Sequence, residues 1–178
     1  MPIDVNYRRL LIASTLAGLA VTLWVSVAGS AVAGAPTSVS LSVSPGGASC
    51  TYSETATPKV TCANLVNQRI KSGTKVTLVA KTNAALPAGW KLFIAHQYVG
   101  PNRNDFVHRG GAKPRTTFPL PYLCSTTSGA TCTKIVSRRV IATTFDLYRA
   151  VVQKADGTNF DAQMYIRWCD TSTPGCVG

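Results

Sequence analysis

The feature that most constrains this chain is an alternation of apolar and polar residues with a period of two. Between residues 38 and 44, Val39, Leu41 and Val43 alternate with serines. Side chains of an extended chain point alternately to its two faces, so this pattern predicts a half-buried β-strand. The Pro-Gly-Gly sequence at 45–47 then ends the strand.

Comparable segments recur along the rest of the chain. The expected strands are 38–44, 74–82, 90–98, 122–125, 131–138, 145–154 and 163–169. Turn residues at 83–89 and 155–158 separate neighbouring strands, and 100–119 is a long polar connection. Residues 122–138 are expected to form a hairpin. Residues 48–72 are polar and irregular, and their part from Val60 to Ile70 fits a short strand or a helical turn equally well.

About seven strands with no convincing amphipathic helix favour one fold class. This class is all-β, an antiparallel β-sandwich of immunoglobulin-like type. Its expected core is Val39, Leu41, Val76, Leu78, Trp90, Leu92, Ile94, Tyr148, Ala150, Val152, Met164, Ile166 and Trp168.

The six cysteines fall into three close pairs separated by long gaps. This spacing favours the local disulfides Cys50–Cys62, Cys124–Cys132 and Cys169–Cys176 among the 15 pairings that six cysteines allow. Each would close a loop of about 8 to 13 residues and stabilise the fold by at most about 2.5–3 kcal/mol. No Cys-x-x-Cys occurs, and no bound metal is expected.

The N-terminus has the layout of a secretory signal. Arg8 and Arg9 precede the uncharged run 10–27, and an Ala-Val-Ala sequence at 31–33 fits a cleavage site. Residues 1–33 are therefore expected to be removed, leaving residues 34–178 as one secreted domain. The alternative is an uncleaved anchor facing outward, because about 20 apolar residues can cross a bilayer.

The chain is strongly basic, with a formal net charge of +11. Residues 34–178 retain 16 Lys and Arg against 6 Asp and Glu. Such an excess favours polyanionic partners: an anionic cell-wall polymer, anionic lipid, or nucleic acid bound without specific recognition. The alternative is that the charge only keeps a secreted protein soluble.

Several of these segments have the pattern of strand and turn residues found in one group of proteins. They are Ser38–Pro45, Gly73–Ala80, Trp90–Ile94, the Cys124–Cys132 segment around Ser128-Gly129, Tyr148–Val152 and Tyr165–Trp168. Together they resemble bacterial secreted immunoglobulin-like domains of the actinobacterial type. The resemblance implies an adhesive, spacer or binding module without catalytic residues or cofactor. The 50–62 insertion, the basic stretch at 103–115 and the tail at 169–176 depart from the pattern.

The residues suggest no catalytic constellation. There is no Gly-x-Ser-x-Gly elbow and no phosphate-binding glycine loop. The six acidic residues of 34–178 are scattered, and disulfide-bonded cysteines cannot act as nucleophiles. Two histidines and one carboxylate (His96, His108 and Asp105) could hold a metal ion. A strand histidine and a solvated loop histidine are the favoured interpretation.

The best candidate binding site is the basic stretch. It combines four cations with an aromatic ring and a histidine: Arg103, Phe106, His108, Arg109, Lys113 and Arg115. Such groups could bind phosphate or carboxylate while the ring stacks on a sugar or base. The alternative is a solvated loop.

The sequence therefore predicts a non-enzymatic binding or adhesion module, secreted or at the cell surface, with an anionic partner. Two other functions stay open. One is a small-ligand carrier of the chromoprotein-apoprotein type. The other is a secreted proteinase inhibitor that presents the disulfide-tied segment 124–132.

Overall fold

The computed structural model describes residues 34–64, 69–100, 110–113, 122–170, 172 and 174–177. They belong to the compact unit Val32–Gly178. The expected signal peptide, residues 1–33, lies outside the described residues. Within the described ranges no helix is long and apolar enough to span a membrane.

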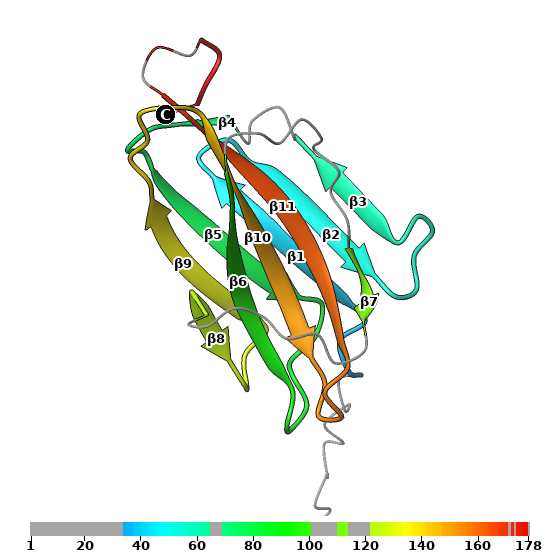
Figure 1. Ribbon diagram of the computed structural model, residues 1–178. Helices are drawn as coiled ribbons and strands as arrows, with labels where there is room; N and C mark the ends of the chain where they lie inside the picture. The colour runs from blue at the N-terminus through cyan, green and yellow to red at the C-terminus, as the bar shows by residue number, and fades with distance from the viewer. Residues whose placement is uncertain are drawn as a thin grey trace, which may run out of the picture. The chain divides into compact units, whose positions relative to one another are not determined.

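These residues form two β-sheets (Figure 1). The first sheet, sheet A, is antiparallel throughout. Its strands in spatial order are β3 (Val60–Ala63), β2 (Ala48–Ser53), β1 (Ser38–Ser44), β5 (Lys75–Thr82) and β9 (Thr131–Ser137). Serine and threonine side chains occupy most of its outer face, because β1 and β2 alternate them with buried residues.

The second sheet, sheet B, contains the longest strands. In spatial order they are β4 (Arg69–Lys71), β11 (Asn159–Cys169), β10 (Thr144–Gln153), β6 (Lys91–Gly100) and β8 (Cys124–Thr126). The short strand β7 (Gly110–Lys113) pairs with the first half of β11. The β4–β11 pair is parallel, and the other pairs are antiparallel.

The core lies between the two sheets. Residues such as Leu41 and Leu78 of sheet A belong to one buried cluster with Ile94 and Ile166 of sheet B. Every residue of the expected core is buried except Trp90, which is partly exposed and precedes β6. Trp168, also expected in the core, is fully buried. The prediction for Trp90 is confirmed only in part: it packs against the core cluster but is not fully buried, because it lies in the turn before β6 and strand pairing begins at Lys91.

The expected strands correspond to β1, β5, β6, β8, β9, β10 and β11, with boundaries shifted by a few residues. Four further strands raise the number in the described residues to eleven. Three of these lie between Ala48 and Lys71, where no clear alternation marks them. β2 and β3 form a hairpin in which Cys50 pairs directly with Cys62.

All three predicted disulfides are present. The predicted hairpin around Cys124–Cys132 is wrong. β8 pairs with β6 in sheet B, whereas β9 pairs with β5 in sheet A. The segment between them changes sheets, and backbone N–H groups of Ser128 and Gly129 donate to Thr126 Oγ1 in its turn. This disulfide therefore joins the edges of two different sheets.

Candidate functional site

A buried carboxylate organises the polar residues between the sheets. Asp146 is 1% exposed. Arg138 Nη1 donates to both of its oxygens, at 2.6 Å and 2.8 Å. Trp168 Nε1 donates to Oδ2 at 2.9 Å, and the Tyr148 hydroxyl lies 3.4 Å from the same oxygen. His96 Nε2 lies 3.2 Å from Oδ1, within ion-pair distance but without the alignment of a hydrogen bond.

Strand register explains how these residues meet. Asp146 and Tyr148 are two positions apart on β10 and therefore point to the same, inner face of sheet B. His96 on β6 pairs with Tyr148, and their rings stack at 5.0 Å. Arg138 follows the last residue of β9 and reaches the carboxylate from the edge of sheet A. The cluster thus connects both sheets at one end of β10.

The surroundings of Asp146 determine its charge. Burial alone would raise its pKa, but contacts with His96 and Arg138 and the charges of these groups lower the pKa below its ordinary value. Burial raises the pKa of Tyr148, and the negative charge of Asp146 raises it further. Asp146 is therefore an anion and Tyr148 a neutral hydroxyl donor at neutral pH.

Two grooves adjoin this cluster and share Arg138. One has a volume of about 230 Å³ and is lined by His96, Leu123, Val136, Ser137, Arg138, Asp146 and Tyr148. The other has a volume of about 290 Å³ and is lined by Tyr98 and by residues 138–144. The Arg138 guanidinium carbon lies 4.5 Å from the centroid of the Tyr98 ring. Arg138 thus connects the buried carboxylate with an exposed aromatic surface.

The arrangement is suited to binding anionic and apolar groups. Arg138 contributes a guanidinium to both grooves, His96 lines the smaller groove, and Tyr98 gives the larger groove an aromatic face. Within the described part of the chain, no three His, Cys, Asp or Glu residues gather as metal ligands would.

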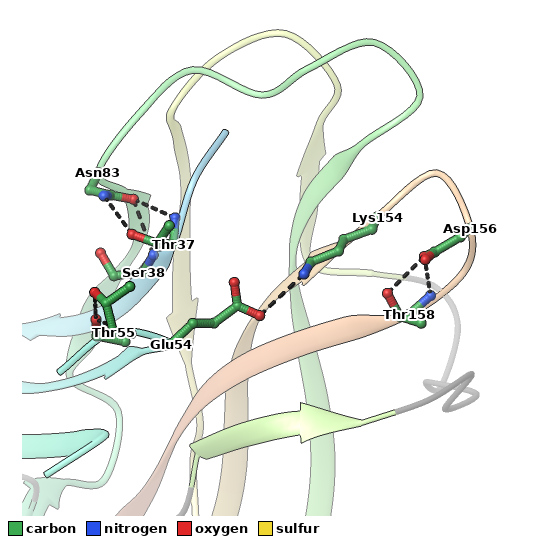
Figure 2. A network of polar contacts seen from close by, with 9 residues as sticks. Thr37, Ser38, Glu54, Thr55, Asn83, Lys154, Asp156 and Thr158 are labelled. Atoms are coloured by element: carbon green, nitrogen blue, oxygen red, sulfur yellow. Dashed lines mark hydrogen bonds and ion pairs between the residues drawn. The ribbon is translucent and has the colours of Figure 1, made fainter. Parts of the chain in front are cut away.

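A second polar network lies beyond the other end of β10 (Figure 2). Lys154 Nζ lies 3.1 Å from Glu54 Oε1, which joins the end of β10 to the segment after β2. The same ammonium lies 5.5 Å from the ring centroids of Trp90 and Phe160. Nearby, Asn83 accepts hydrogen bonds from the backbone of Thr37 and the following residue. These contacts fix the first strand and join the two sheets.

The candidate basic stretch is almost entirely outside the described residues. This applies to Arg103, Phe106, His108, Arg109 and Arg115. Lys113 ends β7, and its backbone pairs with Asn159 of β11. The binding role of these six residues remains a prediction.

Sequence reasoning missed the cluster around Asp146. The available signal was the position of this carboxylate in β10, on the face that also carries Tyr148, Ala150 and Val152. An aspartate on a core-facing position requires a partner. Its partner Arg138 could not be identified, because only the tertiary fold brings the end of β9 close to β10.

Comparison with protein-family models, curated proteins and solved structures finds no match to this chain.

Proposed function

We propose that this protein is a secreted or surface-exposed binding module of immunoglobulin-like topology that engages an anionic extracellular partner. It acts without catalysis. The three disulfides support an oxidising, extracellular setting.

Strand order supports the immunoglobulin-like assignment. In that fold, strands A, B and E share one sheet, and strands C, F and G share the other. The neighbouring strands β1, β5 and β9 of sheet A correspond to A, B and E. The neighbouring strands β11, β10 and β6 of sheet B correspond to G, F and C. β8 follows β6, the strand matched to C, in sequence and pairs with it. The β2–β3 hairpin, β4 and β7 are additions to this arrangement.

The distribution of charge carries the proposal. Of the five described carboxylates, Asp146 and Glu54 are in ion pairs, and Asp161 is buried. The other two, Asp156 and Asp170, accept hydrogen bonds within turns. In contrast, the exposed cations of the described surface are Lys59, Arg69, Lys71, Lys75, Lys81, Lys134 and Arg139. Such a surface attracts polyanions over distances of about 10 Å at moderate ionic strength.

The test separates a basic site from general charge. One variant replaces Arg103, Arg109, Lys113 and Arg115 with Ser, and its control replaces Lys59, Lys75, Lys81 and Lys134. Both lose four positive charges. We expect the first variant to elute from a heparin or teichoic-acid resin at a much lower salt concentration than the control.

One result would contradict the anionic partner, and another would contradict the basic stretch as its binding site. If wild-type protein is not retained on either resin at low salt, the anionic partner is wrong. If both variants lose retention equally, the basic stretch is not the binding site and only the general charge matters.

A further inference from the structure

The larger of the two grooves has the composition of a small-ligand site. A single connection, residues 138–144, forms most of it, and Tyr98 of β6 completes it. Its volume of about 290 Å³ is close to the lower end of the range for pockets that hold small organic ligands. The described residues that line it do not belong to the basic stretch 103–115.

Exposed apolar side chains concentrate there. Tyr98 is 55% exposed and Ile141 is 103% exposed. With Ile135, these are the large hydrophobic side chains that the described part of the chain leaves in solvent. Two of the three line the same groove. Tyr98 and Ile141 therefore give the groove apolar surface that a bound ligand could cover.

The two arginines of the groove differ in their partners. Arg138 is ion-paired with Asp146, and its guanidinium lies over the Tyr98 ring. These contacts hold both side chains in place before a ligand arrives. Arg139 is exposed and makes no ion pair with a described carboxylate. The groove therefore presents one positive charge beside an apolar surface.

We infer that this groove binds a small amphipathic monoanion, such as an aromatic carboxylate. The apolar body of the ligand lies against Tyr98 and Ile141, and its anionic group pairs with Arg139. The inference rests on the proposed function for its anionic ligand, and it adds a ligand class and a place. A neutral apolar ligand would use the same surface without Arg139, and a polyanion would use Arg139 without Ile141.

A pair of fluorescent probes distinguishes these possibilities. The anionic probe is 8-anilinonaphthalene-1-sulfonate, and the uncharged probe is N-phenyl-1-naphthylamine. Site variants are Arg139→Gln and Ile141→Ser. Matched controls are Lys134→Gln and Ile135→Ser, which remove an exposed cation and an exposed isoleucine from β9 outside the groove. Melting temperatures verify that each variant is folded.

We expect Arg139→Gln to weaken binding of the anionic probe about 3- to 5-fold, in the range of an exposed ion pair, without affecting the neutral probe. Ile141→Ser should weaken both probes, and the controls should weaken neither. The inference is wrong if folded wild-type protein does not bind the anionic probe. It is also wrong if either site variant behaves like its control.

Resin retention and probe affinity are both measured on the wild type, the groove variants and the basic-stretch variant. The two measurements together distinguish the two proposals. Loss of resin binding by the basic-stretch variant with unchanged probe affinity would support the function alone. Probe binding that depends on Arg139 in a protein that no polyanion resin retains would support the groove alone.

Discussion

Asp146 is the acceptor on which the polar contacts of Arg138, Tyr148 and Trp168 converge. Replacing it with Asn keeps the shape but removes the charge that Arg138 requires. Because Arg138 is 32% exposed, solvent moderates the loss, and we expect Asp146→Asn to lower the free energy of unfolding by about 2 kcal/mol. Urea denaturation measures this. The control Asp156→Asn removes an exposed carboxylate from a turn and should have a much smaller effect. Equal losses would contradict the central role of Asp146.

The same residue predicts how stability depends on pH. The pKa of Asp146 is lower in the folded state than its unfolded value of about 3.9. Unfolding therefore takes up a proton in acid, so this stabilisation is present above about pH 4 and is lost as pH falls through the folded pKa. The melting temperature of the wild type should therefore decrease as the pH is lowered below about 4. Asp146→Asn should show a shallower decline, and an unchanged profile would exclude Asp146 as a cause.

At the scale of elements, the Cys124–Cys132 disulfide connects β8 of sheet B with β9 of sheet A. β8 has only three residues, and among the described strands it pairs with β6 alone, so the disulfide is a main support for it. Replacing both cysteines with Ser should cost at most about 2.5 kcal/mol in the free energy of unfolding. Amide exchange should accelerate in β8 and in the residues of β6 that it covers.

The Cys50–Cys62 disulfide provides the comparison, because it lies within the β2–β3 hairpin. Its removal should accelerate exchange in β3 and leave β8 unchanged. If removing either disulfide accelerated exchange in both places, the two strands would not be supported locally.

At the scale of the whole molecule, the excess of positive charge controls association. Residues 34–178 carry 16 Lys and Arg against 6 Asp and Glu. Raising NaCl from about 50 mM to about 500 mM shortens the screening length to a few ångströms. Binding to heparin should therefore weaken by at least about tenfold, as fluorescence anisotropy with labelled heparin can measure. Binding of the neutral probe to the groove should not weaken, because it involves no ion pair.

The sequence was sufficient for features that depend on local pattern. The alternation predicted the long strands, and twelve of the thirteen residues that it assigned to the core are buried. It did not identify other core residues such as Tyr52 and Phe160. Close spacing predicted all three disulfides. The sequence did not predict strand pairing between segments that are far apart in the chain. β8 and β9 are adjacent in sequence, but each pairs with an earlier strand, β6 and β5, in a different sheet. The contact between Arg138 and Asp146 is likewise tertiary, since the turn from β9 to β10 must place the guanidinium beside the carboxylate.

The local disulfides also have a consequence for a cleaved chain. No disulfide crosses the stretch between Cys62 and Cys124. A protease site inserted in the turn at residues 83–90, between β5 and β6, would thus yield two fragments without a covalent link. Pairing of β5 with β9 and the shared core would still hold them together. The protein is consequently a candidate for split-reporter complementation, with each half carrying its own disulfides.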